Sequence, residues 1–391
     1  MLFSYHIPTN LLFGAGALDQ LHRQRLPGKR ALMVMSGGGS ARRNGSLHRL
    51  EKELSAAGVS WTQFDRVLPN PTLENVQEGT DLAKAEDCDF ILGFGGGSSI
   101  DCAKAIAVMC TNEGSFWDYL FAGTGGRKKM VNAPLPLVAV STTAGTGTEL
   151  DPWTVISNPS TREKIGGGNH RCFPVLSVVD PTVMTSLPPH LTAFQGFDAL
   201  FHGIECYLSK TASPLSDLFS KEVVSSVSGS LAQACAHGED LAAREAVAYG
   251  STLAGISMTL SSNGSHHAME HALSAFHPEI PHGAGLIMLS RSYFSHLAQK
   301  VPQVASRLVD LARCIGGLRA AEPMDFIYAL DRLQQACGVS ALSLAQYGVT
   351  REEIPALASN AQETMGMLFA MDRFSLSLED CIHIYQNAYD G

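Results

Sequence analysis

The sequence has no long hydrophobic run and no basic cluster, which excludes two classes of protein. A membrane-spanning helix needs about 20 consecutive apolar residues, and no such stretch occurs among the 391 residues. Lys and Arg number 28 against 37 Asp and Glu, giving a formal net charge of −9. Because nucleic acids are bound chiefly through Lys and Arg contacts to phosphate, neither nucleic acid nor a membrane is an expected partner.

Cysteine pairing is also absent. None of the nine cysteines forms a Cys-x-x-Cys pair, so a zinc ribbon or a dithiol redox motif is not expected. Scattered cysteines are typical of reduced, buried residues in a cytoplasmic protein. The first residues lack the charged segment and the cleavage site of a secretory signal. We therefore expect a cytoplasmic location.

Hydrophobic residues make up 45% of the chain, enough for a large core and two domains. Strand-like and helix-like segments alternate up to residue 186. Strands are expected at 31–35, 59–64, 90–94, 136–140 and 176–180, and helices at 46–58, 73–85 and 99–108. This alternation predicts an α/β domain with a parallel sheet and helices on both faces.

Strand signals disappear after residue 187, and long amphipathic patterns take their place. Helices are expected at 192–208, 214–237, 240–261, 292–315 and 323–337. Their apolar residues recur at helical spacing over many turns. The sequence therefore predicts an α/β domain over 1–186 and an all-helical domain over 187–391.

A glycine-rich turn joins one expected strand to the helix that follows it. The turn consists of Gly95, Gly96, Gly97 and Ser98, and Asp101 lies in the first turn of the helix. Bare backbone N–H groups and the positive end of a helix can hold a pyrophosphate, and glycine permits its close approach. The run departs from a full Gly-x-Gly-x-x-Gly pattern at Ser98, so a purely structural turn stays open.

The second half holds two pairs of side chains at helical spacing. Asp198 and His202 are four residues apart, as are His267 and His271, and His282 follows in Pro-His-Gly. Residues four apart lie on one face of a helix, one turn from each other. Such pairs, with a loop histidine, can enclose one divalent metal. A single helix histidine is more often a core or surface residue, so the prediction depends on the joint pattern.

Several stretches together resemble the iron-containing (group III) alcohol dehydrogenase family over nearly the whole chain. They are FGGGSSIDCAKAIA, STTAGTGTEL (141–150), VVDPTVMTSLP (178–188), GFDALFHGIECY (196–207), HAMEHALSAF (267–276) and PHG (281–283). The resemblance implies a Rossmann-like dinucleotide-binding domain, a helical metal-binding domain of the dehydroquinate synthase-like architecture, and a cleft between them.

The resemblance also implies individual site residues. The implied metal ligands are Asp198, His202, His267 and His282. His271, the second histidine of H-A-M-x-H, is implied to lie near the nicotinamide and to relay a proton. The implied cofactor-binding residues are Thr142, Thr143, Thr146, Gly147 and Lys164, and Asp101 contacts the cofactor or complements its helix N-terminus.

One departure from the family concerns the stretch between the last two histidines of the site. The segment from His271 to His282 is one residue longer than in well-known members. His266 and His277 therefore stay open as substitute ligands, although our plain interpretation of both is a histidine on the surface or at a pocket rim.

The turn after residues 31–35 bears on the choice of cofactor. It consists of Gly37, Gly38, Gly39 and Ser40, with Arg42 and Arg43 just beyond. NAD-specific folds often place an acid at this strand end to hold the ribose 2′-hydroxyl, and here that acid is missing. Hydroxyl, N–H and guanidinium groups suit a 2′-phosphate. The run also looks like the turn of the family's NADP-dependent members, so we predict NADP(H), with NAD(H) and a plain flexible turn as alternatives.

The ligand set alone does not determine the identity of the metal. Three nitrogen ligands and one oxygen ligand suit Fe²⁺, Zn²⁺, Mn²⁺ or Co²⁺, and intrinsic affinity places zinc above iron. The family resemblance favours Fe²⁺, with Zn²⁺ as the alternative. A divalent metal lowers the pKa of an alcohol and polarises an aldehyde carbonyl.

We therefore predict an alcohol dehydrogenase or aldehyde reductase that acts on a small primary alcohol or aldehyde. A polyol (glycerol-type) dehydrogenase and a lyase related to dehydroquinate synthase are the alternatives. The lyase needs a basic pocket for an acidic substrate, and few Lys or Arg residues stand near the metal motifs. A non-catalytic binding protein is disfavoured because every ligand position is filled.

The opening segment, residues 3–16, has two short apolar runs joined by Pro-Thr-Asn. This pattern predicts a terminal hairpin whose apolar edge needs a partner. Since most soluble homo-oligomers are closed and symmetric, we expect a homodimer or a larger homo-oligomer.

Overall fold

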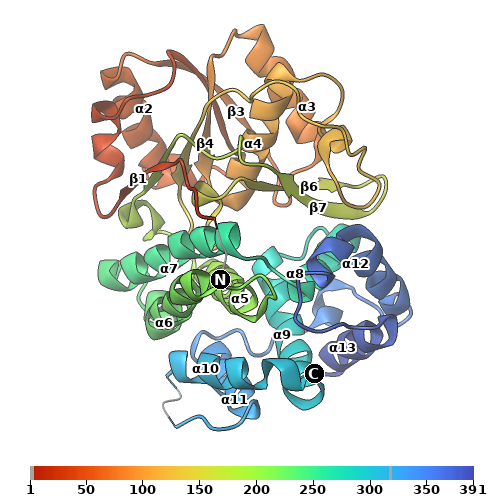
Figure 1. Ribbon diagram of the computed structural model, residues 1–391. Helices are drawn as coiled ribbons and strands as arrows, with labels where there is room; N and C mark the ends of the chain where they lie inside the picture. The colour runs from red at the N-terminus through yellow and green to blue at the C-terminus, as the bar shows by residue number, and fades with distance from the viewer. Residues whose placement is uncertain (1–3, 317–318) are drawn as a thin grey trace.

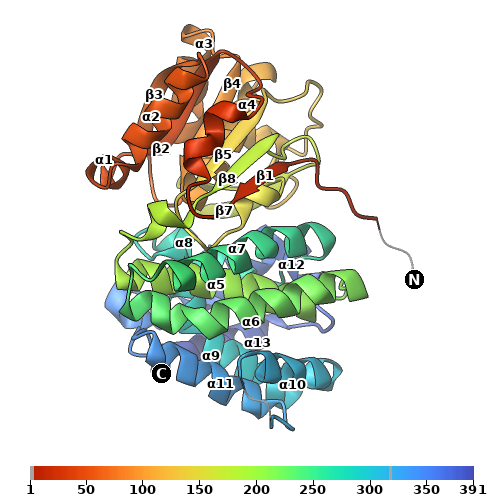
Figure 2. The same cartoon turned by 90° about the vertical axis from the view of Figure 1, so that its left-hand side faces the viewer.

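The structure, a computed structural model, describes residues 4–316 and 319–391. An α/β half stands on a helical half, as the two views in Figures 1 and 2 show. The last strand of the main sheet ends at Val179 and the first long helix begins at Pro189. The division at residue 187 remains our proposal for the domain boundary.

The α/β half is built on a six-stranded sheet in the order β1-β8-β5-β4-β2-β3, and every neighbouring pair is parallel. Its strands are β1 (Asn10–Phe13), β2 (Arg30–Ser36), β3 (Ser60–Val67), β4 (Phe90–Gly95), β5 (Leu137–Ser141) and β8 (Leu176–Val179). Its α-helices are α1 (Ser40–Arg43), α2 (Ser46–Ala56), α3 (Leu73–Ala85) and α4 (Gly97–Thr111). The predicted parallel α/β domain is confirmed.

Side chains of the sheet alternate between two cores. Met33 of β2 belongs to one core, which also takes in α2 and the helical half, whereas Leu32 and Val34 belong to the other, with α3 and α4. This alternation follows from the two-residue period of a strand. One continuous core therefore runs from the face of the sheet that packs against α2 into the helical half.

The helical half follows in nine α-helices within the described residues. They are α5 (Pro189–Leu208), α6 (Pro214–Ala236), α7 (Leu241–Leu260), α8 (Ser265–Phe276), α9 (His282–Lys300), α10 (Ala305–Cys314), α11 (Met324–Ala336), α12 (Ile354–Phe369) and α13 (Leu378–Asp390). Short 3₁₀ turns are η1 (Leu18–Arg23), η2 (Phe116–Tyr119), η3 (Thr148–Leu150), η4 (Pro181–Met184), η5 (Pro302–Val304) and η6 (Leu344–Tyr347). None of the described helices has the length and apolar character needed to cross a bilayer.

The predicted N-terminal hairpin is wrong. Residues 4–9 form no strand, and β1 pairs in parallel with β8, from Asn10 opposite Leu176 to Phe13 opposite Val179. Pro8 has no backbone N–H to give to a hairpin partner, while the edge of the sheet offers β1 a full set of partners. Leu11 on this edge strand is 41% exposed, and the homo-oligomer stays a prediction.

Two further elements differ from the expectation. The helix expected at 292–315 is interrupted at Val301 (φ −122°, ψ 81°), because the residue before a proline is pushed out of the helical region. An antiparallel hairpin of β6 (Trp153–Asn158) and β7 (Glu163–Gly168) was not predicted. Three glycines at the end of β7 hide the strand pattern, since glycine is depleted in strands.

The two halves touch through a pair of glycines. A Cβ on Gly255 of α7 would lie 2.2 Å from the carbonyl oxygen of Gly147. Gly147 has φ 63°, a left-handed conformation that glycine adopts readily. Just beyond it, Thr252 of α7 donates a hydrogen bond of 3.1 Å to Glu149. The threonine-rich stretch 142–148 therefore packs directly against α7.

The glycine contact gives a stability prediction. Gly255→Ala should lower the free energy of unfolding by about 1–3 kcal/mol, because the new methyl group must displace the backbone of Gly147. Gly229 in α6 is the matched control, since a Cβ there meets nothing within 4 Å and alanine stabilises a helix relative to glycine. Thermal unfolding compares the two variants. Equal melting temperatures would show that the halves tolerate the extra methyl group.

Candidate metal and nucleotide site

Three helices of the lower half carry the predicted metal ligands. Asp198 and His202 lie on α5, His267 and His271 on α8, and His282 is the first residue of α9. α5 is buried over most of its length because it runs through the middle of the helical half. Its polar side chains Asp198 and His202 are therefore held inside the protein.

Asp198 Oδ1 is the point on which the site converges. It lies 3.2 Å from His202 Nε2, 3.5 Å from His267 Nε2 and 3.4 Å from His282 Nε2. Within residues 4–316 and 319–391, neither Asp198 Oδ1 nor His267 Nε2 has a hydrogen-bond partner, although both are buried. A buried carboxylate oxygen without a partner is costly unless a cation satisfies it.

The opposite nitrogen of each ring is held by an oxygen. His202 Nδ1 lies 3.1 Å from Asn263 Oδ1 and His267 Nδ1 lies 2.5 Å from Glu205 Oε1, while His282 Nδ1 contacts Glu270 Oε2. An imidazole that donates from Nδ1 keeps the lone pair of Nε2 for a metal. Asp198, His267 and His282 are close enough together to hold one ion, and His202 Nε2 reaches the same carboxylate oxygen. Together the four residues form a donor set that fits a divalent metal.

The carboxylates of this cluster are held in the ionised form. Burial raises the pKa of Asp198, but the imidazoles of His202 and His282 outweigh it and hold that pKa well below its usual value. Burial likewise raises the pKa of Glu205, and His267 and His266 more than compensate. Against the lowering effect of burial, Glu205 raises the pKa of His267. Protons therefore compete with a metal for this ring.

His271 lies beside this cluster and outside the convergence on Asp198. Its ring centroid is 5.6 Å from that of His282, and its buried Nδ1 has no hydrogen-bond partner in the described part of the chain. Burial, and then the ammonium of Lys164, lower its pKa well below the usual value. The expectation that an unperturbed pKa suits His271 to proton exchange does not hold in this environment, and its relay role stays a prediction.

His266 is placed differently from the expectation. It is fully buried, with Nδ1 3.1 Å from Glu205 and Nε2 3.0 Å from the carbonyl of Leu286. The interpretation as a surface or rim histidine is wrong, because α8 is covered on this side by α9. Both ring nitrogens face oxygen atoms other than those of Asp198. Glu205, His266 and His267 are close enough together to hold an ion, so His266 as a substitute ligand stays an untested alternative.

His277 also stands apart from the metal ligands. Its Nε2 lies 2.8 Å from Glu353, and it belongs to none of the clusters of His, Cys, Asp and Glu among the described residues that can hold a metal. The structure thus gives His282, and neither His266 nor His277, a place around Asp198.

The nucleotide residues gather at the carboxyl ends of neighbouring strands β4 and β5. The N–H of Thr142 donates to the carbonyl of Gly95 at 2.9 Å. A Cβ on Gly96 would lie 2.8 Å from Thr143 Oγ1, and one on Gly97 would lie 2.5 Å from Thr146 Cγ2. The glycine turn and the threonine stretch therefore form one surface without bulky side chains, at the sheet edge where α/β folds bind ligands.

The start of α4 modifies the expectation for this turn. α4 begins at Gly97, so Gly97 and Ser98 lie in its first turn. Asp101 accepts hydrogen bonds from Thr148 Oγ1 at 2.6 Å and from the N–H of Val155 at 2.8 Å. Its carboxylate thus joins α4 to η3 and β6, and its contact with a nucleotide stays a prediction.

Lys164 connects the two halves of the site. It lies in β7 and is 4% exposed, whereas its sequence context alone indicates an exposed loop lysine. Its Nζ is 3.2 Å from Glu270 Oε2 and 3.2 Å from His282 Nδ1. Sequence reasoning missed the two glutamates here. The available signal was their spacing, since Glu205 follows His202 by three residues and Glu270 follows His267 by three.

The turn of Gly37, Gly38, Gly39 and Ser40 is exposed at the end of β2. No acid stands within this turn, but β3 brings one to it. The guanidinium of Arg42 lies 3.2 Å from Asp65 Oδ2 and 2.7 Å from Gln63 Oε1. Arg43 donates to the carbonyl of Gly38 at 3.0 Å. Both arginines therefore already have partners, and the local sequence did not show Asp65.

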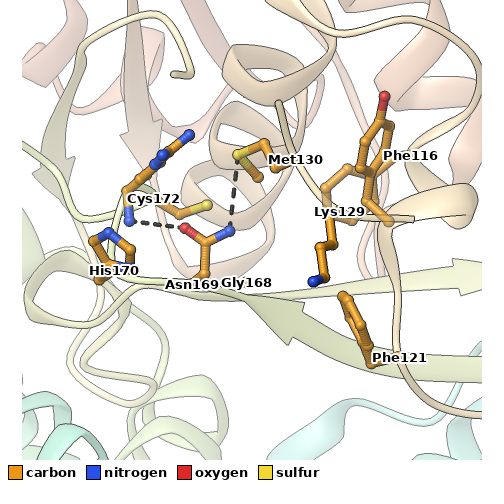
Figure 3. Close-up of a pocket in the computed structure, with 10 residues that line it drawn as sticks. Phe116, Phe121, Lys129, Met130, Gly168, Asn169, His170 and Cys172 are labelled. Carbon is orange, nitrogen blue, oxygen red and sulfur yellow. Dashed lines mark hydrogen bonds between the residues drawn. The ribbon is translucent and has the colours of Figure 1, made fainter. Parts of the chain in front are cut away.

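A cavity of about 310 Å³ lies in the α/β half, between the loop after α4 and the residues that follow β7. Figure 3 shows Phe121 and Lys129 on one side of it and Asn169 and His170 on the other. The side-chain amide of Asn169 donates a hydrogen bond from Nδ2 to Met130 Sδ, 3.8 Å away, and this contact forms part of the cavity wall. None of the lining residues belongs to the predicted metal or nucleotide site, so this cavity is separate from both.

A nucleotide-type sheet edge above a buried three-histidine, one-carboxylate cluster defines the class of metal-dependent dinucleotide enzymes. Family models described as "Iron-containing alcohol dehydrogenase" and "Fe-containing alcohol dehydrogenase family, C-terminal" match residues 8–181 and 192–389. The chain belongs to the iron-containing alcohol dehydrogenase family. It is an oxidoreductase that acts on alcohols, and the lyase alternative is not favoured.

Individual relatives agree with this assignment. The chain is 34% identical to a 1,3-propanediol dehydrogenase of Citrobacter freundii over 92% of each chain. It is 30% identical to a probable NADH-dependent butanol dehydrogenase of Bacillus subtilis over 92% of this chain and 93% of the relative. Among solved structures, a halo-thermophilic archaeal alcohol dehydrogenase from a Red Sea brine pool superposes with a TM-score of 0.94, at 30% identity over 99% of each chain.

The convergence on Asp198 predicts the effect of removing ligands. Asp198→Ala and His267→Ala should each lose bound metal, because a deleted ligand weakens a site whose binding depends on the complete donor set. Metal content per purified chain, measured by mass spectrometry, tests this expectation. His277→Ala is the control and should keep its metal. Full metal content in Asp198→Ala would contradict the ligand assignment.

The glycine turn predicts a separate effect on the nucleotide. Gly96→Val should weaken dinucleotide binding by roughly tenfold to a hundredfold, because its side chain must displace Thr143, at a cost of about 1–3 kcal/mol. Metal content should be unchanged, since the turn belongs to the other half. Fluorescence titration with the reduced dinucleotide measures the affinity, and wild-type affinity would remove this turn from the site.

Proposed function

We propose that the protein interconverts small primary alcohols and aldehydes, with a nicotinamide dinucleotide and a divalent metal held by Asp198, His202, His267 and His282. The observation that carries this proposal is the convergence of three Nε2 atoms on Oδ1 of Asp198, which has no hydrogen-bond partner among the described residues. Relatives named as dehydrogenases of 1,3-propanediol and butanol support a small alcohol as the substrate.

The residues of the chain divide the work of this reaction. The bound metal supplies a Lewis acid for the substrate oxygen, and the dinucleotide carries the hydride. The glycine turn and Thr142, Thr143, Thr146 and Gly147 position the dinucleotide at the sheet edge. His271 lies beside the cluster, and its buried Nδ1 has no hydrogen-bond partner in the described chain, so it is the group that we propose for exchange of the hydroxyl proton. Burial and Lys164 lower its pKa and make it a weak base, so the ring would hold that proton only briefly.

Fe²⁺ is the metal that we propose, with Zn²⁺ as the alternative, because the family is named for iron and the donor set suits both. A preference for NADP(H) rests on the turn 36–40 alone. The pairing of Arg42 with Asp65 and the name of the NADH-dependent relative both favour NAD(H), so the preference stays a prediction. A homodimer and a cytoplasmic location are likewise proposals.

A reduction assay tests the function. Protein loaded with Fe²⁺ under anaerobic conditions should oxidise the reduced dinucleotide only when butanal is added, as followed by the near-ultraviolet absorbance of the nicotinamide. His267→Ala should be inactive, and Zn²⁺-loaded protein tests the choice of metal. NADPH and NADH are compared by kcat/KM, and equal or better use of NADH would overturn the NADP(H) prediction. No aldehyde-dependent oxidation with either dinucleotide would overturn the function.

A further inference from the structure

Glu270 occupies the variable position of the H-A-M-x-H stretch on α8 and is completely buried. Its Oε2 contacts His282 Nδ1 and lies 3.2 Å from Lys164 Nζ. Its Oε1 accepts a hydrogen bond from Ser274, one turn further along the same helix. Both carboxylate oxygens are therefore engaged, and the side chain is fixed between α8, α9 and β7.

His282 depends on such a contact more than the other ligands do. Its side chain is 23% exposed, against 7% for His202 and 2% for His267. It opens α9, after the non-helical residues 277–281, whereas His202 lies within α5 and His267 lies in the first turn of α8. In the described part of the chain, Nδ1 of His282 meets only Glu270 and Lys164. These contacts determine where its Nε2 points.

Glu270, His271 and His282 are close enough together to hold a second metal, but a cation is already present. Lys164 Nζ stands 3.2 Å from Glu270 Oε2 and 3.2 Å from His282 Nδ1. A second dication next to this buried ammonium would be strongly repelled. The group is therefore a support for His282 rather than a second metal centre.

We propose that Glu270 is a positioning residue of the metal centre, which accepts the Nδ1 proton of His282 so that Nε2 faces Asp198, while Lys164 from the other half holds the carboxylate in place. The inference rests on the proposed function, because it assumes that His282 is a ligand. It assigns Glu270 a role that the helical spacing of the ligands does not require.

Three substitutions at this position separate charge, reach and hydrogen bonding. Glu270→Ala removes the acceptor and should weaken metal binding by about 10–100-fold, the usual effect of losing a carboxylate behind a ligand histidine. Glu270→Asp keeps the charge but withdraws the carboxylate by one methylene, so it should also bind weakly. Glu270→Gln keeps both reach and an accepting oxygen and should bind more tightly than Glu270→Asp.

Glu53→Ala provides a matched control. Glu53 is also a buried glutamate, and its Oε2 lies 2.6 Å from Nδ1 of His22, but the pair lies in the α/β half outside both predicted sites. This variant loses a comparable Glu–His contact and should keep wild-type metal affinity. Equal losses in Glu53→Ala and Glu270→Ala would mean that general destabilisation explains the effect, which would overturn the inference.

Metal affinity is measured with Zn²⁺ in competition with a chromophoric chelator, and ligand geometry by the visible spectrum of the Co²⁺-loaded protein. A weaker affinity and an altered cobalt spectrum in Glu270→Ala, with dinucleotide binding intact, support the proposal. Wild-type affinity and spectrum in that variant overturn it. If Glu270→Ala fails to fold, the metal affinities of Glu270→Asp and Glu270→Gln are compared instead. Equal affinities of these two variants overturn the proposal. A wild-type protein that binds no metal overturns the proposed function as well, which distinguishes the two failures.

Discussion

The structure depends on one buried atom, Oδ1 of Asp198, which faces three imidazole nitrogens and finds no hydrogen-bond donor in the described chain. Such an atom destabilises a protein unless a cation compensates it. The other ring nitrogen of each imidazole, Nδ1, lies next to an oxygen atom of Asn263, Glu205 or Glu270. The central position of α5 keeps this group of side chains away from solvent. α8 and α9 pass close to α5, which places His267 and His282 beside Asp198.

The α/β half completes this arrangement from above. Its hairpin β6–β7 was hidden in the sequence by glycines, yet it carries Lys164 to the metal cluster. The close approach of Gly147 and Gly255 brings the threonine stretch onto α7. A Cβ at either position would collide with the backbone of the other glycine, so the two halves can approach this closely only with glycine at both. The small residues at the boundary are thus needed for the site as much as for the fold.

Local spacing was sufficient wherever one element determined the outcome. The alternation of strands and helices predicted the parallel sheet, and two four-residue pairs predicted which side chains of α5 and α8 share a face. Prediction was wrong where partners distant in sequence decide the structure. The N-terminal segment pairs with β8 and forms no hairpin. His266 is buried because α9 packs over it, and Asp65 of β3 lies next to the glycine turn although it is distant in sequence. The carboxylates behind the histidines were missed for the same reason. Their three-residue spacing marks Glu205 and Glu270 as neighbours of a histidine on their own helix, but the ring that each one meets, His267 or His282, lies on another helix.

Charge balance explains why these particular groups occur together. Asp198, Glu205 and Glu270 are buried and held ionised by their neighbours, and Lys164 is the buried ammonium in contact with Glu270. A fourth acid, Asp372, stays neutral near pH 7, since burial raises its pKa to about 8. In this group the carboxylates outnumber the ammonium, so a bound cation would add favourable charge to it. The excess of carboxylate over ammonium therefore favours a cation at this point, in agreement with the convergence of the imidazole nitrogens on Asp198.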